Sequence, residues 1–260
     1  MLQTAKFTAG LAALALLTAC NNSLLQSKAV EKPLEVQTVD RIAALNTRLG
    51  IGYLREGRNE LAFKKLSKAL EIQPDYSGAH NAMGILYERL GQPKRAERHF
   101  ESALATAPQD SAARNNYGGF LCRQGRVDDA VSQFEAAIAN PLYKAPYRAM
   151  TNAGLCLSNT ERKDEAEAYL RRALRLQPKQ PSALLAMSEL TAATGRQLSA
   201  RAYLQRYVEQ GQHNSRSLWL GVRIERELGD RNAASSYAML LKAKYPDAKE
   251  TRLLLESESR

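Results

Sequence analysis

A 34-residue period runs through most of this chain. Two series of glycines mark it in the first half of the sequence, namely Gly50, Gly84 and Gly118, and Gly57, Gly91 and Gly125. A fixed period of this length is typical of arrays in which each unit is one supersecondary structure and neighbouring units bury a shared core. The period therefore predicts a stack of similar units, and it decides the architecture before any local pattern does.

The stretch from Ser77 to Asp110 predicts that each unit is a pair of helices. Apolar residues recur at helical spacing on both sides of a turn at Gly91, and Pro108 closes the unit. A glycine after the first helix can adopt the left-handed conformation that ends a helix. Proline stops the second helix because it lacks an N–H donor and clashes with the preceding turn. We expect small residues where the helices cross and large ones between them: Gly84, Ala96 and Ala103, and Tyr87 and Phe100.

These residues resemble the tetratricopeptide repeat, a helix-turn-helix unit of 34 residues. The resemblance implies an all-α fold, a right-handed superhelical solenoid of about six tetratricopeptide repeats over residues 38–260. Thr38 or Asp40 can cap the first helix. The loop before the fourth repeat is two residues longer, the fifth repeat has Ser188 at the crossing position, and the sixth is divergent. The expected repeats are 43–76, 77–110, 111–144, 147–180, 181–214 and 215–248, followed by a short polar C-terminal cap.

The first 37 residues predict a secretion signal and a tether. A weakly positive start is followed by an apolar run too short to span a membrane, as in a signal peptide covering residues 1–19. Residues Leu17 to Cys20 resemble the lipobox of bacterial lipoproteins, which implies lipidation of Cys20 and a lipidated tether over residues 20–37. Asn21 rather than Asp follows the cysteine, which implies the outer membrane. The alternative is an ordinary signal peptide that ends near a cysteine.

The composition shows no sign of catalytic, cofactor or metal chemistry. The chain carries a formal charge of +10, but its charges alternate at helical spacing, so we expect solvated helix faces rather than one basic surface, and no nucleic-acid partner. The three histidines lack the spacing of metal ligands; we expect His80 between helices and His99 in solvent.

Cys122 and Cys156 lie on adjacent first helices in a compartment that permits disulfides. We favour separate thiols and keep a disulfide as the alternative.

The first helices of the repeats are expected to line a concave groove that binds a protein segment. Three arginines recur at the 34-residue spacing, asparagines cluster on the same helices, and an apolar strip accompanies them. Asparagine is a poor helix former but can pair with an extended peptide backbone. The alternative is that these are ordinary solvated residues. The predicted groove residues are Ile51, Leu54, Arg55, Asn81, Ile85, Arg89, Asn115, Asn116, Arg123 and Asn152.

The lipobox, the tether, the number of repeats and the phrase from Asn115 to Cys122 (N-N-Y-G-G-F-L-C) together resemble the type IV pilus pilotin family. The resemblance implies a non-enzymatic, lipid-anchored outer-membrane protein that binds secretin subunits and promotes their localisation and multimerisation. We expect a monomer. A first alternative is a scaffold or adaptor lipoprotein for peptidoglycan hydrolases or outer-membrane protein assembly. A second alternative is an enzyme on a helical-repeat scaffold. Whether the loose fifth and sixth repeats bind anything stays open.

Overall fold

The computed structural model describes residues 34–259 except residue 212, and within that part the chain forms thirteen α-helices and no strand. The helices are α1 (Leu34–Arg55), α2 (Asn59–Ile72), α3 (Ser77–Arg89), α4 (Pro93–Thr106), α5 (Ser111–Arg123), α6 (Val127–Ile138), α7 (Pro146–Ser158), α8 (Lys163–Leu176), α9 (Pro181–Ala193), α10 (Gln197–Val208), α11 (Ser215–Glu227), α12 (Arg231–Lys244) and α13 (Lys249–Glu258). The predicted all-α fold is confirmed. In the described part of the chain, none of the helices is both long and apolar enough to cross a membrane.

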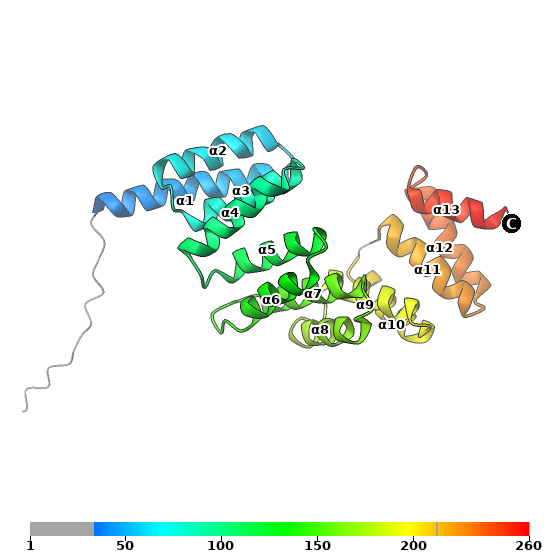
Figure 1. Ribbon diagram of the computed structural model, residues 1–260. Helices are drawn as coiled ribbons and strands as arrows, with labels where there is room; N and C mark the ends of the chain where they lie inside the picture. Colours follow the sequence, from blue (N-terminus) through cyan, green and yellow to red (C-terminus); the bar gives the residue numbers. More distant parts are fainter. Residues whose placement is uncertain (1–33, 212, 260) are drawn as a thin grey trace, which may run out of the picture.

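The helices pair into six hairpins that follow one another along a superhelical solenoid, from α1 and α2 at one end to α11 and α12 at the other (Figure 1). We call the odd-numbered helices α1 to α11 the first helices and the even-numbered helices the second helices. Each first helix packs on its own second helix and on the first helices of its neighbours, and each second helix also meets the next first helix. α13 packs on α11 and α12 at the C-terminal end.

The crossing of the two helices in a repeat depends on a glycine that faces a large side chain. A Cβ atom added at Gly84 would lie 2.8 Å from the Phe100 ring, and one added at Gly118 would lie 2.8 Å from the Phe134 ring. Phe100 and Phe134 are fully buried. The ring occupies the space that any other residue would fill with its Cβ, so the two helix axes can approach closely.

The two divergent repeats solve the same crossing in different ways. In the fifth repeat, buried Ser188 replaces the glycine, and its hydroxyl donates a hydrogen bond of 2.8 Å to the carbonyl of Ala200 on the second helix. In the sixth repeat, Val222 takes the crossing position, and a glycine stands one residue earlier. A Cβ atom added at that residue, Gly221, would lie 2.8 Å from the Tyr237 ring. The sixth repeat therefore keeps a glycine that faces an aromatic ring, but in a register shifted by one residue.

The first helix begins earlier than predicted. α1 starts at Leu34, directly after Pro33, and not at a cap formed by Thr38 or Asp40. No glycine or proline interrupts the chain between Leu34 and Asp40, so nothing in this segment ends a helix before Thr38. The helix thus takes in four residues of the predicted tether. The signal peptide and Cys20 lie outside the described residues.

A disulfide joins the middle of the array, contrary to the favoured prediction of separate thiols. Cys122 on α5 and Cys156 on α7 are bonded, with Cα atoms 5.8 Å apart. The loop between α6 and α7 is longer than the other loops between repeats, and it shifts the register of the fourth repeat by two residues. The shift brings Cys156 opposite Cys122 on the neighbouring first helix. Both thiols were expected on adjacent helices, but the repeat period alone does not determine which sides of those helices face each other.

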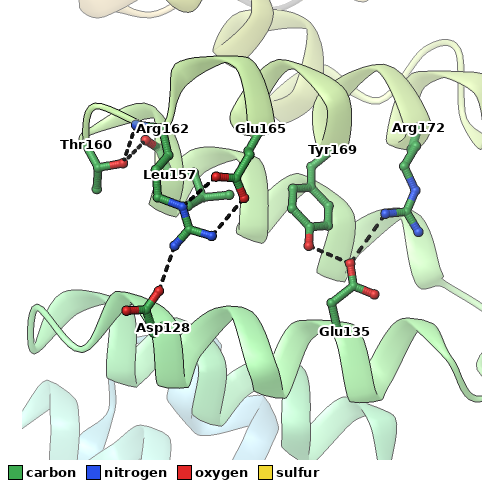
Figure 2. Close-up of polar contacts among 8 residues, drawn as sticks. All are labelled: Asp128, Glu135, Leu157, Thr160, Arg162, Glu165, Tyr169 and Arg172. Atoms are coloured by element: carbon green, nitrogen blue, oxygen red, sulfur yellow. Dashed lines mark hydrogen bonds and ion pairs between the residues drawn. The ribbon is translucent and has the colours of Figure 1, made fainter.

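The second helices are joined by a series of arginine contacts that the sequence did not predict. Arg162, at the N-terminus of α8, donates a hydrogen bond of 2.7 Å to Asp128 on α6, and it also binds Glu165 on its own helix (Figure 2). Further along, the Tyr169 hydroxyl donates to Glu135 of α6 (Figure 2). Exposed pairs of this kind add little stability singly, but their repetition fixes how one hairpin sits on the next. Equivalent arginines at the starts of α6 and α10 pair in the same way: Arg126 with Glu97, and Arg196 with Glu167.

Substituting Gly118 by alanine should destabilise the fold. The added Cβ atom would lie 2.8 Å from the Phe134 ring and 3.1 Å from the Ala130 carbonyl oxygen, so the hairpin of repeat three must open. Overpacking of this kind costs about 1–3 kcal/mol. Chemical denaturation of the purified chain, followed by circular dichroism at the helix minimum, measures the change. The matched control is Gly52→Ala on α1, where no atom lies within 4 Å of the added Cβ. It should gain up to about 1 kcal/mol from helix propensity. Equal effects of the two substitutions would contradict the role of the crossing.

Removing the disulfide with Cys122→Ser and Cys156→Ser should lower stability by about 2–4 kcal/mol, because the bond closes a loop of 34 residues and restricts the unfolded chain. Thermal unfolding in the presence and absence of a reducing agent measures the effect. The reductant should lower the melting temperature of the wild-type chain and leave that of the double variant unchanged. If the melting temperature of the wild-type chain does not change although its cysteines are fully reduced, the disulfide does not stabilise the array.

Candidate protein-binding surface on the first helices

Polar contacts between neighbouring first helices bring most of the predicted groove residues onto one surface. We call this surface the inner face and define it by Ile51, Arg55, Asn81, Ile85, Arg89, Asn116, Arg123 and Asn152, which lie on α1, α3, α5 and α7. The contacts join residues about one repeat apart, so each of them crosses from one hairpin to the next. The inner face is therefore a row of helices held at fixed spacing, and its side chains do not belong to separate loops.

Two pairs of asparagines link three consecutive first helices. The side-chain amide of Asn116 on α5 donates a hydrogen bond of 3.0 Å to Asn81 on α3. The amide of Asn152 on α7 donates a hydrogen bond of 3.0 Å to Asn115 on α5. Each of these amides has two N–H groups, so Asn116 and Asn152 each keep one donor beyond the inter-helix bond. The asparagines both join the repeats and leave hydrogen-bonding capacity on the inner face.

The three predicted arginines differ in how free they are. Arg123 on α5 makes two hydrogen bonds to Glu88 on α3, of 2.6 and 2.8 Å. Arg89 donates to the carbonyl of Leu54, near the C-terminus of α1, where cations are favoured by the helix dipole. Arg55 is exposed and makes no hydrogen bond or ion pair with any residue that the structure describes. Among the described contacts, two of the three guanidiniums thus already join neighbouring repeats, and one remains free.

The apolar part of the predicted groove is smaller than expected. Ile51 and Ile85 are half-buried, and each keeps part of its side chain on the inner face. Leu54 is only 4% exposed and packs in the core with Leu66 and Leu86, so its predicted place on the groove is wrong. Leu54 lies three residues after Ile51, so the two side chains differ in direction by about 60° around the helix axis. This difference is enough for Leu54 to pack against α2 and α3. Asn115 is also buried, at 9% exposure, and supports the surface without forming much of it.

The histidines of repeat two form a pair that the sequence did not predict. Nε2 of His80 donates a hydrogen bond of 2.8 Å to the carbonyl oxygen of Pro74, and Nδ1 of His80 lies 2.9 Å from Nδ1 of His99. His99 also stacks on the Tyr87 ring, with centroids 5.2 Å apart, so its predicted position in solvent is wrong. Burial, followed by the nearby His80 and Arg98, lowers the pKa of His99 to about 4. No group of three or more His, Cys, Asp or Glu side chains that could hold a metal is found among residues 34–259, with residue 212 set aside.

Two of the contacts between first helices follow a regular spacing. Asn81 and Asn116 are 35 residues apart, and so are Glu88 and Arg123, one residue more than the repeat period. The offset arises because residues that meet across two stacked helices do not occupy identical positions of the repeat. The arrangement as a whole presents hydrogen-bond donors, a cation and a narrow apolar strip on a rigid row of helices, which suits recognition of another chain.

Comparisons with known proteins agree with this fold. Sequence models of the tetratricopeptide repeat match residues 40–109, 81–149 and 147–180. The type IV pilus assembly protein PilF of Pseudomonas aeruginosa is 34% identical over 203 residues, which cover 78% of this chain and 81% of PilF.

Two solved structures are similar over most of their length. The structure of Pseudomonas aeruginosa PilF has a TM-score of 0.74 at 34% identity, and the match covers 85% of this chain and 99% of that one. The crystal structure of PilW, described as a widely conserved type IV pilus biogenesis factor, has a TM-score of 0.76 at 30% identity, covering 82% of this chain and 98% of that one. By sequence and by structure, this chain belongs to the PilF/PilW family of tetratricopeptide-repeat proteins of type IV pilus systems.

Proposed function

We propose that this protein is a pilotin, which binds secretin subunits of a type IV pilus system and promotes their localisation and multimerisation in the outer membrane. Its membership of the PilF/PilW family supports a role in pilus biogenesis. The observation that carries the proposal furthest is the length of the match to PilF, which covers 85% of this chain and 99% of the solved PilF chain. Such an extended match is expected if the whole solenoid serves the same kind of task in both proteins.

The inner face supports a binding role because it is preorganised. The Asn81–Asn116 and Glu88–Arg123 contacts hold the first helices in place before any partner arrives. A surface that is already ordered loses less conformational entropy on binding, which favours affinity. In this proposal the half-buried Ile51 and Ile85 accept apolar side chains of the secretin segment. Arg55 then binds a carboxylate or a backbone carbonyl of that segment, since a guanidinium offers several donors in a fixed plane.

The lipid anchor is the second part of the proposal. Lipidation of Cys20 after removal of residues 1–19 would attach the chain to the periplasmic side of the outer membrane. Each buried methylene of the acyl chains contributes about 0.8 kcal/mol to this attachment. A tethered binding surface raises the local concentration of its client at the membrane. Catalysis has no part in this mechanism, which requires only recognition and placement.

Substituting Arg55 by glutamate should reduce secretin multimers by about tenfold in a strain that carries the variant in place of the wild-type gene. The substitution reverses the charge of a free cation on the inner face, and loss of an interface arginine commonly costs more than about 1.4 kcal/mol, a factor of ten. Immunoblots of unboiled membranes measure the high-mass secretin band. Deletion of the gene should abolish that band, and the wild-type gene should restore it.

The matched control is Arg175→Glu on α8, which makes the same change of charge on an exposed residue of a second helix. It should leave the secretin band at the wild-type level. An unchanged band in the deletion strain would overturn the pilotin proposal itself. If the secretin band is lost in the deletion strain but intact with Arg55→Glu, the result would support the pilotin function but would show that Arg55 and the inner face around it are not the docking surface. Pull-down of peptidoglycan hydrolases in place of secretin subunits would favour the adaptor alternative.

A further inference from the structure

A hollow of about 610 Å³ opens on the side of the solenoid that the first helices line, at its C-terminal end. Its walls come from α7, α9 and α11 and from the C-terminal helix α13, which follow one another toward the C-terminal end of the chain in Figure 1. None of the described residues that line it comes from a second helix. The hollow therefore lies on the same side of the row of first helices as the inner face, with which it shares α7 but none of the residues that define that face.

The apolar part of the lining includes the single tryptophan of the chain. Trp219 is half-buried on α11, and Leu253 of α13 is 37% exposed beside it. Leu155 of α7, also half-buried, adds to the apolar part of the lining. Tryptophan and leucine that remain accessible in a concave site are typical of positions where a partner inserts an apolar side chain.

Two of the cations that line the hollow have no partner among the described residues. Arg216 binds Glu189 through two hydrogen bonds, so this pair is internally neutralised. Arg223 and Lys249 are exposed, and neither makes a hydrogen bond or an ion pair within the described part of the chain. Glu250 is the remaining carboxylate of the described lining. Three cations against two acids leave this lining with a net positive charge. Arg223 lies about one turn after Trp219 on α11, and Lys249 lies about one turn before Leu253 on α13.

The repeat period shows that this end of the solenoid differs in chemistry from the other. The position occupied by Ile51 and Ile85 in the first two repeats is occupied by Leu155 in the fourth. In the fifth and sixth repeats the same position carries Glu189 and Arg223, which are 34 residues apart. The apolar strip of the first repeats therefore gives way to charged side chains. The two ends of the solenoid therefore present different side chains to a partner at this position of the repeat.

We propose that the hollow is a second docking site, for a short acidic segment of a partner protein that places an aromatic or aliphatic side chain against Trp219 and Leu253 and its carboxylates on Arg223 and Lys249. Charge complementarity selects this occupant, because two cations that are unpaired in the described structure line the same hollow as two accessible apolar side chains. Carboxylates bind a guanidinium through short charge-assisted hydrogen bonds. The proposal concerns repeats four to six and does not depend on the pilotin function or on the identity of its client.

The test uses the fluorescence of Trp219, which reports on the hollow alone because the chain has no other tryptophan. The purified full chain is titrated with two short synthetic peptides that share phenylalanine and leucine residues, one with aspartates and the other with lysines at the remaining positions. The acidic peptide should shift the Trp219 emission to shorter wavelength and saturate. The basic peptide should bind about tenfold more weakly or not at all. Equal binding of the two peptides, or no binding of the acidic one, overturns the proposal.

Two charge-reversed variants separate a specific site from general electrostatic attraction. Arg223→Glu with Lys249→Glu should weaken binding of the acidic peptide by about tenfold or more. Lys64→Glu with Lys94→Glu makes the same change in net charge on exposed residues of α2 and α4, far from the hollow, and should leave the affinity unchanged. Equal weakening by both variants would mean that the peptide responds to the overall charge of the chain, and the proposed site would be rejected. Circular dichroism of each variant verifies that its helices remain folded.

Discussion

The structure depends on one steric relation that recurs along the array. In five of the six hairpins that the structure describes, a glycine on the first helix faces a bulky side chain sixteen residues later on the second, as Gly84 faces Phe100 and Gly221 faces Tyr237. In the fifth hairpin, Ser188 bonds directly to the second helix instead. Because the hairpins have similar internal geometry, they can stack on one another with a similar rise and rotation. The continuous surface formed by the first helices follows from that regularity.

A second set of interactions converts the stack of hairpins into a rigid surface. Asn81 with Asn116 and Glu88 with Arg123 join first helices, and Asp128 with Arg162 joins second helices. The polar side chains that suggested a binding groove thus have two roles, since they fasten repeats to each other and also leave donors on the surface. A solenoid that interacts only with its nearest neighbours needs such links if a binding face is to span several units.

The helical hairpins, the turn glycines and the fold could be predicted from the sequence because they depend on residues within one repeat. Prediction failed where the answer depended on which side of a helix faces its neighbour. Leu54 lies in the core, His99 stacks on Tyr87, and Cys122 is bonded to Cys156. In each case the spacing along a helix is known from the sequence, whereas the side that faces a neighbour is set by the packing of the helices. That packing lies within one repeat for His99 and Tyr87, and between two repeats for the disulfide. For the same reason, the period located all three arginines of the groove but could not separate the free one from the two that are engaged.

The covalent link between Cys122 and Cys156 lies near the midpoint of the array and ties the third hairpin to the fourth. Arrays of this kind fray from their ends, because terminal units have only one neighbour. A crosslink in the interior divides the molecule into two arms that can loosen separately, while the fastened hairpins between them stay closed. If the leading arm carries the lipid anchor proposed above and is pulled by it, the strain should stop at these hairpins, and the trailing arm should keep its shape under load.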